Sequence, residues 1–317
     1  MALLEVDNLS IGYRTKQGTL KAVEGVSFAL DEGQSLGFVG ESGCGKTTIG
    51  MALMGLLSPN ASIGQGRILF EGQDLLLMTE EERRATRWSR IAMIFQAAMN
   101  AMNPVLRVGD QVAEAILVHN PTVEKEAALH QVEELFDLVG IPRDRLRDYP
   151  HQYSGGMKQR AIIAMALACR PKLIIADEPT TALDVIVQDQ ILQEVKKLQE
   201  EFNIGVIFIS HDISIVADMC QNIAVMYAGQ MVECGPREAV FESPVHPYTK
   251  ALLSSFPTIT GEKNDLTPIP GETPNLILPQ VGCRFGERCS SASPFCKKEA
   301  PKWVQIGPGH KALCCHC

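Results

Sequence analysis

The sequence has no apolar run long enough to cross a membrane. A transmembrane helix needs about twenty consecutive apolar residues, and the most apolar comparable segment, residues 161–169, ends at Arg170 and Pro171. The first seven residues also lack the basic stretch with which a secretory signal peptide begins. We therefore expect the chain to stay in the cytoplasm and to reach a membrane only through partner subunits.

Positive charge is also scarce. The 317 residues carry 29 Lys and Arg against 37 Asp and Glu, a net charge of −8. Proteins that bind nucleic acid need a basic face to neutralise phosphates, so we expect no nucleic-acid partner. No internal repeat, heptad array or low-complexity tract is evident. A hydrophobic content of 45% is ample for a buried core, and the length allows one large domain with a small appendage.

What the sequence does contain is a phosphate-binding loop at residues 40–48. Gly-Glu-Ser-Gly-Cys-Gly-Lys-Thr-Thr matches G-x-x-x-x-G-K-[ST] between an apolar run (36–39) and a segment with helical character (49–54), the context that the motif requires. The glycines turn backbone N–H groups toward one centre, a lysine reaches the β- and γ-phosphates, and a threonine hydroxyl binds Mg²⁺. The residues expected to contact ATP are Gly40, Glu41, Ser42, Gly43, Cys44, Gly45, Lys46, Thr47 and Thr48.

The order of apolar runs predicts an α/β fold. Runs at 4–6, 22–30, 36–39 and 67–70 predict strands, and helical spacing at 111–118 and 123–139 predicts a helical insertion over about residues 97–152. Helix and strand signals then alternate, which indicates a mostly parallel sheet covered on both faces: helix 155–167, strand 173–176, helix 185–202 and strand 205–210.

The composition changes towards the C-terminus. Eleven of the eighteen prolines lie from Pro236 onward, and six of the ten cysteines lie in the last thirty-five residues. This predicts an ATPase domain over residues 1–260 and a small, loop-rich and Cys-rich tail over residues 261–317.

Four polar residues follow apolar strands and are candidates for catalysis. Asp177 ends the strand 173–176, where a carboxylate that holds Mg²⁺ is expected. Glu178 follows it and can act as general base on a water molecule. Gln96 ends the run 91–95 and can bind Mg²⁺ or the attacking water, and His211 follows the strand 205–210.

A further motif, in addition to the phosphate loop and the residues after the strands, makes the combination of motifs specific. Ser154-Gly155-Gly156 opens a predicted helix and supplies a second anion site. In order and spacing, the phosphate loop, Gln96, this signature, Asp177-Glu178, the turn Thr181–Asp184 and His211 resemble the ATP-binding cassette (ABC) family of transporter ATPases. The signature departs from the family's usual residues only at Tyr153 and Met157.

The resemblance implies more than the motifs alone. It implies a phosphate-loop NTPase core, an antiparallel β-subdomain and an inserted helical subdomain. It implies that Tyr13 stacks on adenine and that Asp184 belongs to the nucleotide site. It also implies two cassettes facing head to tail, each nucleotide lying between one phosphate loop and the other cassette's signature, so that ATP closes the pair and hydrolysis reopens it.

Finer features resemble the ATPases of dipeptide and oligopeptide importers. These are the segments 95–105, 246–253 and 269–272, the last leading into 282–285. Nickel importers share part of the pattern and remain an alternative. The implied partners are a second ATPase subunit (a homologous chain or this chain itself), two transmembrane permease subunits and an extracytoplasmic solute-binding protein, with this chain on the cytoplasmic face of the membrane. The apolar run 99–106 is expected either to dock on a permease or to pack internally.

Two other classes of protein are less well matched. Soluble ABC proteins of DNA repair or translation carry coiled coils, zinc insertions or two cassettes, and none of these is evident here. A redox- or iron-sensing module that uses the cassette as a scaffold would not need Glu178 and His211.

The tail cysteines suggest a metal site. A disulfide framework is disfavoured in a reducing cytoplasm, and zinc ligand pairs usually lie about two to four residues apart, closer than the first three cysteines here. The resemblance to peptide importers implies a [4Fe–4S] cluster, with Zn²⁺ as the alternative, acting as a structural staple far from ATP. The implied ligands are Cys283, Cys289, Cys296 and Cys315, and the neighbouring Cys314 and Cys317 leave the fourth position open.

Overall fold

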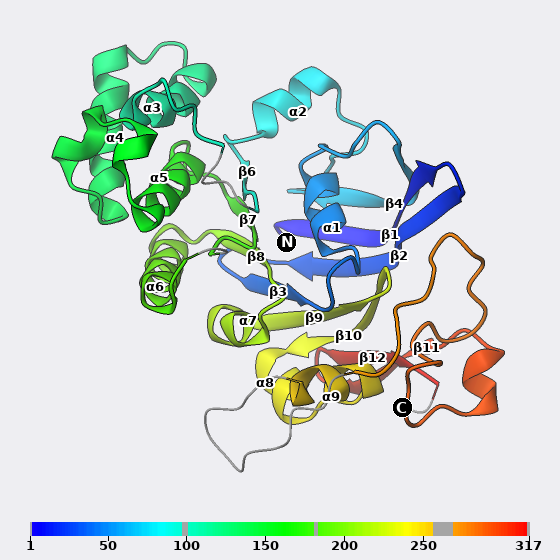
Figure 1. Ribbon diagram of the computed structural model, residues 1–317. Coiled ribbons are helices and arrows are strands. Elements are labelled where there is room, and N and C mark those ends of the chain that lie inside the picture. Colours follow the sequence, from blue (N-terminus) through cyan, green and yellow to red (C-terminus); the bar gives the residue numbers. More distant parts are fainter. Residues whose placement is uncertain (1, 97–100, 181–182, 256–268, 316–317) are drawn as a thin grey trace. The chain divides into compact units, whose positions relative to one another are not determined.

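The structure, a computed structural model, describes residues 2–96, 101–180, 183–255 and 269–315 (Figure 1). The chain forms two compact units. The first comprises Met1–Leu30, Ser35–Leu76 and Ile209–Cys317, and the second comprises Asp31–Gln34 and Leu77–Phe208. Among the described helices, none combines the length and the apolar character that crossing a bilayer would require.

An antiparallel sheet forms the N-terminal part of the first unit. Residues Leu4, Val6, Leu9 and Ile11 of its strand β1 are buried, and this strand pairs with a neighbour on each side, so that Leu4 lies opposite both Leu30 and Phe70. The antiparallel β-subdomain that the family resemblance implied is therefore present. The strand order is β2-β1-β4-β5, with β1 (Leu4–Thr15), β2 (Gly18–Leu30), β4 (Ala61–Phe70) and β5 (Gln73–Asp74).

Five further strands of the first unit are ordered β11-β12-β10-β9-β3. The β3–β9 pair is parallel, whereas β10 runs antiparallel to both β9 and β12, so the sheet is mixed. The strands are β3 (Ser35–Val39), β9 (Asn222–Tyr227), β10 (Gln230–Pro236), β11 (Lys302–Gly307) and β12 (His310–Cys314). The helices of this unit are α1 (Lys46–Leu53), α7 (Ile213–Met219), α8 (Arg237–Glu242), α9 (Pro247–Ser254) and the 3-10 turn η4 (Pro294–Lys297).

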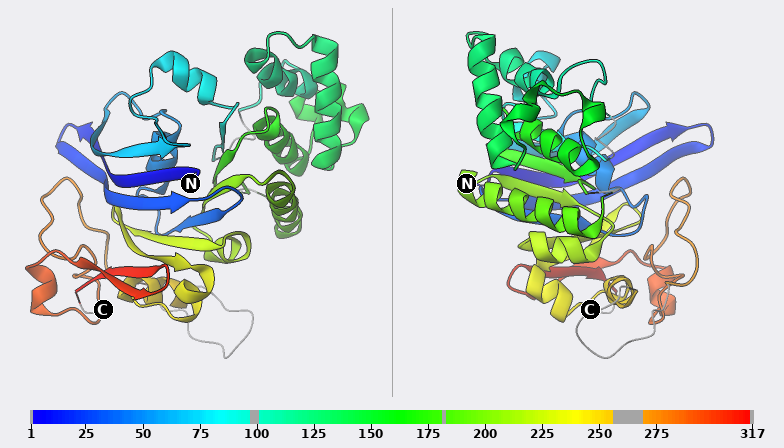
Figure 2. Two further views of the ribbon diagram at one scale, coloured as in Figure 1. Left: turned by 180° about the vertical axis from the view of Figure 1, so that it is seen from behind. Right: turned by 60° about the vertical axis from the view of Figure 1, so that its left-hand side comes forward.

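The second unit combines buried parallel strands with most of the helices. Its strands are ordered β8-β7-β6, and the pair β6–β7 is parallel. The strands are β6 (Ile91–Ile94), β7 (Leu173–Asp177) and β8 (Gly205–Ile209). The helices are α2 (Glu80–Thr86), α3 (Val108–His119), α4 (Lys125–Leu138), η2 (Arg143–Arg147), η3 (Pro150–Gln152), α5 (Gly155–Leu167) and α6 (Val185–Phe202). In Figure 2 the green helices α3, α4 and α5 gather in one group.

Local sequence signals explain where the long helix α6 begins and ends. The Asp184 side chain accepts a hydrogen bond from the Val187 N–H and caps its N-terminus, and Asn203 adopts the left-handed conformation at its C-terminus. The buried positions Ile191, Val195 and Leu198 recur every three to four residues, which places one apolar stripe against the core.

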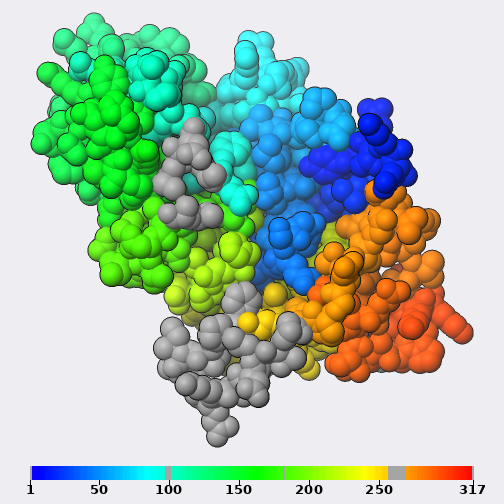
Figure 3. All heavy atoms as spheres, in the orientation of Figure 1, coloured from blue at the N-terminus to red at the C-terminus, as the bar shows by residue number. Residues whose placement is uncertain are grey.

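The tail contains more regular structure than its composition predicts. Strands β11 and β12 form a hairpin that pairs with β10, although proline and glycine predicted loops. Part of the tail also packs on the N-terminal sheet, since the Lys21 N–H donates to the Leu276 carbonyl over 3.2 Å. In Figure 3 orange tail atoms border the blue N-terminal atoms. The boundary predicted near residue 260 lies outside the described residues and stays a prediction.

Candidate functional site

The phosphate loop, residues 40–48, connects β3 to α1 in the first unit. Gly40 and Gly45 have φ angles of +145° and +106°, which residues with a side chain rarely adopt. A Cβ atom on Gly40 would lie 2.1 Å from the Met226 carbonyl oxygen, and one on Gly45 would lie 2.4 Å from that of Ala22. Both positions therefore require glycine, which lets the loop turn its backbone N–H groups toward an anion.

The Lys46 ammonium lies against the loop that precedes it. Its Nζ atom donates to the carbonyl oxygens of Gly40 and Glu41, over 2.6 and 3.0 Å, and the residue is only 6% exposed. The Tyr13 hydroxyl on β1 lies 3.3 Å from Thr48 Oγ1 at the start of α1. The first unit thus brings the predicted phosphate-binding and adenine-stacking residues next to one another.

The second unit brings two of the catalytic candidates into contact. Asp177 is the last residue of β7 and is 2% exposed. Glu178 follows it with a φ of +47°, an uncommon conformation for a residue with a side chain and one that is often found at functional sites. Gln96, just beyond β6, donates from Nε2 to Glu178 Oε2 over 2.7 Å. Because β6 and β7 are parallel neighbours, their C-terminal ends share one sheet edge.

The Ser154-Gly155-Gly156 signature lies at the N-terminus of α5, also in the second unit. The Ser154 hydroxyl accepts a hydrogen bond from the Met157 N–H over 3.2 Å. The unusual Tyr153 that precedes it is buried, and its hydroxyl donates to the Arg145 carbonyl oxygen over 2.9 Å. The tyrosine is therefore packed inside the helical part of the second unit.

The remaining candidates divide between the two units. Asp184 caps α6 in the second unit, and Thr181 of the same turn lies outside the described residues. His211 is an exposed residue of the first unit, just after β8. The first unit therefore brings the phosphate loop together with Tyr13, and the second unit brings Gln96 together with Glu178.

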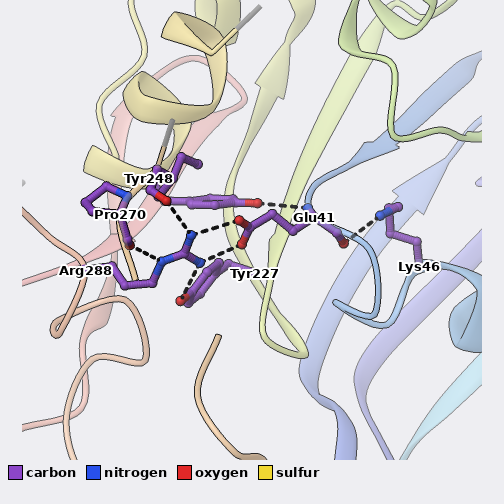
Figure 4. Close-up of polar contacts among 7 residues, drawn as sticks. Glu41, Lys46, Tyr227, Tyr248, Pro270 and Arg288 are labelled. Carbon is purple, nitrogen blue, oxygen red and sulfur yellow. Dashed lines mark hydrogen bonds and ion pairs between the residues drawn. The ribbon is translucent and has the colours of Figure 1, made fainter. Parts of the chain in front are cut away.

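The sequence analysis missed two residues that reach the phosphate loop, Arg288 of the tail and Tyr248 of α9. The Arg288 guanidinium donates to both carboxylate oxygens of Glu41, over 2.7 and 2.9 Å, and the Glu41 N–H donates to the Tyr248 hydroxyl over 3.0 Å (Figure 4). The tail therefore contacts the phosphate loop directly, whereas the expectation that a cluster acts as a structural staple far from ATP stays a prediction. One feature of the sequence could have indicated Arg288. This arginine stands directly before a predicted ligand, Cys289, in a segment with few other side chains that could bury the arginine.

The tail cysteines lie near one another in the first unit. The Cys283 N–H donates to the Cys296 carbonyl oxygen over 2.7 Å. Burial is the main cause that raises the pKa of Cys283 and of Cys289, and neighbouring cysteines raise it further. Burial also acts to raise the pKa of Cys296, but hydrogen bonds from Ser293 and Cys315 outweigh it and lower that pKa.

The arrangement of these thiols is not that of a finished metal site. Within the described part of the chain, no group of three or more His, Cys, Asp or Glu side chains is placed to hold a metal ion. Cys314 ends β12 and is buried, Cys315 follows it, and Cys317 lies outside the described residues.

Comparison with known protein families shows which family has these features. The family described as "ABC transporter" matches residues 23–181, which include the phosphate loop, Gln96, the signature and Asp177-Glu178. The chain belongs to the ABC transporter family. A second family, "Oligopeptide/dipeptide transporter, C-terminal region", matches residues 232–296 of this ABC ATPase. That match covers Arg288 and the first three tail cysteines and ends before Cys315.

Curated relatives and solved structures agree with this family. The dipeptide transport ATP-binding protein DppD of Bacillus subtilis (strain 168) is 47% identical, over 98% of this chain and 94% of the relative. The oligopeptide transport ATP-binding protein OppD of Escherichia coli (strain K12) is 44% identical, over 99% and 93%. The ATP-binding cassette MJ0796, solved as a dimer in a post-hydrolysis state with ADP and Pi, is 25% identical with a TM-score of 0.67, over 74% of this chain and 98% of that one. The prediction of an ABC ATPase is therefore confirmed.

Proposed function

We propose that this chain hydrolyses Mg–ATP to drive the import of dipeptides or oligopeptides through a membrane transporter. The observation that carries the proposal is the match of residues 232–296 to the peptide-transporter C-terminal region in a chain whose cassette motifs are complete. The relatives named above are called dipeptide and oligopeptide transport proteins, which favours peptides over nickel as the solute.

The chemistry is divided among the candidate residues. Lys46 and the loop N–H groups bind the phosphates, and Tyr13 stacks on the adenine. Thr47, Gln96 and Asp177 would hold Mg²⁺, which would supply positive charge to the transferred phosphoryl group. Glu178 accepts the proton of the attacking water while Gln96 orients its carboxylate through their 2.7 Å hydrogen bond. His211 contacts the γ-phosphate.

A second copy of the site completes each nucleotide pocket. Ser154, Gly155 and Gly156 open α5, where N–H groups and the helix dipole favour an anion. Asp184 lies after β7, where it caps α6. In the proposed pair these groups face the phosphate loop of the other cassette, which is this chain or a homologous one. Two permease subunits and an extracytoplasmic solute-binding protein complete the transporter, and the chain lies on the cytoplasmic face of the membrane.

The second unit offers a place for a permease to dock. An apolar cavity of about 350 Å³ lies among α3, α5 and the segment after β6, and the nearby Val105 and Val118 are 75% and 65% exposed. This cavity supports docking of an apolar segment of the permease over internal packing of the run 99–106, of which residues 99–100 lie outside the described residues. The residues that line the cavity include Trp88, Phe95, Met102, Ala115 and Met165.

The proposed occupant of the tail thiols is a [4Fe–4S] cluster held by Cys283, Cys289, Cys296 and Cys315. Support comes from the proximity of these thiols and from the lowered pKa of Cys296, because iron binds thiolate. Zn²⁺ remains the alternative.

The substitution Glu178→Gln tests the proposed function. It removes the base but keeps the size and hydrogen-bonding capacity of the side chain, so Mg–ATP binding should persist while turnover falls by about 10²–10⁴-fold. Phosphate release measured with the permease subunits present would show this. Glu201→Gln, on the exposed face of α6 in the same unit, should hydrolyse ATP at the normal rate. Normal turnover in Glu178→Gln would contradict the assignment.

A further inference from the structure

Two buried arginines of the tail, Arg284 and Arg288, lie next to the phosphate loop and the residues that contact it. They lie in the segment 283–289, which a cysteine bounds at each end. The Arg284 side chain is 3% exposed and donates to Glu24 Oε2 over 2.8 Å and to the Ala228 carbonyl oxygen. The next residue, Gly229, donates its N–H to the Cys44 carbonyl oxygen over 3.0 Å. The segment 283–289 therefore contacts the hairpin formed by β9 and β10, and this hairpin supports the phosphate loop.

Arg288 makes the more direct contact. Its side chain is 5% exposed and donates to both Glu41 carboxylate oxygens. Further N–H groups donate to the Pro270 carbonyl oxygen over 2.8 Å and to the Ile269 carbonyl oxygen over 3.3 Å, and the guanidinium lies over the Tyr227 ring (Figure 4). A fifth N–H donates to the Tyr227 hydroxyl over 3.3 Å, so every donor of this planar fork is used, which a lysine ammonium could not reproduce.

Glu41 is in turn held at three points. Its carboxylate pairs with Arg288, its N–H donates to the Tyr248 hydroxyl over 3.0 Å, and its carbonyl oxygen accepts from Lys46 Nζ over 3.0 Å. The second residue of the phosphate loop thus links the tail to the lysine that binds phosphate. Phe285 completes the support by packing against the rings of Tyr227 and Tyr248, with centroids 5.2 and 5.4 Å away.

We propose that Arg288 is a positioning residue for the phosphate loop, acting through Glu41 to set both the shape of the loop and its net charge. The proposal rests on the nucleotide binding proposed above. Without the guanidinium, the Glu41 carboxylate loses its partner, leaves its present position and competes with the nucleotide phosphates for Lys46. The Glu41 side chain is 28% exposed, so removing the guanidinium leaves a partly desolvated carboxylate without its partner, which is unfavourable. A neutral side chain at position 41 removes that charge.

The test measures Mg–ADP binding to the isolated chain of 317 residues by calorimetry, which requires neither hydrolysis nor a partner subunit. We expect Arg288→Ala to raise the Kd about tenfold, equivalent to about 1.4 kcal/mol. The double variant Glu41→Gln/Arg288→Ala should bind within about threefold of Glu41→Gln alone, since no unpaired carboxylate remains. Arg67→Ala removes an exposed arginine paired with Asp7 in the same unit and should bind as the wild type does.

The outcomes separate this inference from the proposed function. If Lys46→Ala binds Mg–ADP as tightly as the wild type, the nucleotide site itself is wrongly assigned. If Lys46→Ala loses binding while Arg288→Ala keeps wild-type affinity, only the role of Arg288 fails. An equal loss on removing Arg288 from the wild type and from the Glu41→Gln variant would also overturn it, since Arg288 would then act without the Glu41 carboxylate. Should Arg288→Ala fail to fold, Arg288→Lys decides: several-fold weaker binding supports the proposal and wild-type affinity overturns it.

Discussion

His246 is a buried residue whose surroundings keep it uncharged. It is 1% exposed, its Nδ1 atom accepts from the Tyr248 N–H over 3.0 Å, and it hydrogen-bonds to the backbone of Leu313. Burial lowers the pKa of His246 to about 4, although the nearby Glu233 carboxylate acts in the opposite direction. Glu233 is itself fully buried and accepts from the His246 N–H, over 2.9 Å, and lies 2.8 Å from His310 Nε2.

This low pKa makes folding of the first unit pH-dependent. An unfolded histidine titrates near pH 6.5, so between about pH 6.5 and pH 4 the unfolded chain binds a proton that the folded chain does not. The free energy of unfolding should therefore fall as the pH falls through this window, by on the order of 3 kcal/mol at most. We expect His246→Asn, which still caps α9 but cannot titrate, to show a flatter dependence of melting temperature on pH. The exposed His130→Asn should follow the wild type, and equal slopes for all three proteins would contradict the prediction.

At the scale of elements, the sequence predicts best what is encoded locally. The helices α5 and α6 begin at Ser154 and Asp184, whose side chains cap them, and apolar runs gave the buried strands β3, β7 and β8. The hairpin β11–β12 was missed because β11 is largely exposed, β12 is only five residues long, and both lie among prolines and glycines. The contact between Arg288 and Glu41 joins residues 247 positions apart, and no local pattern reports such a pairing.

The cavity among α3 and α5 gives the element-scale prediction. Ala115 on α3 lines this cavity, and Ala115→Trp should fill much of it because indole adds a large apolar volume. We expect the ATPase rate of the isolated chain to stay near normal, while stimulation by the permease subunits falls at least several-fold. Ala127→Trp on α4 lines a different cavity of the same unit and serves as the matched control. Full stimulation of the Ala115 variant would place the docking surface elsewhere.

At the scale of the whole molecule, the tail is attached to the cassette at several separate places. Arg288 reaches the phosphate loop, Arg284 reaches Glu24 on β2, and β12 pairs with β10. The proposed cluster ligands lie at both ends of the segment that carries these arginines and again after β12. A cluster would therefore join parts of the tail that are far apart in sequence, and this cross-link should stabilise the first unit by restricting its unfolded state.

Metal content and stability test this cross-link together. Protein purified without oxygen should be brown and contain about four iron and four sulfide per chain. Cys296→Ser should lose most of the iron and melt at a lower temperature, because its loss leaves the proposed cluster with three ligands. Cys234→Ser replaces a thiol on β10 of the same unit whose pKa burial raises to about 11, and it should keep its iron. A colourless wild-type protein with one zinc per chain would replace the cluster by a zinc site. A Cys296→Ser protein that keeps its iron would show that the ligands are wrongly assigned.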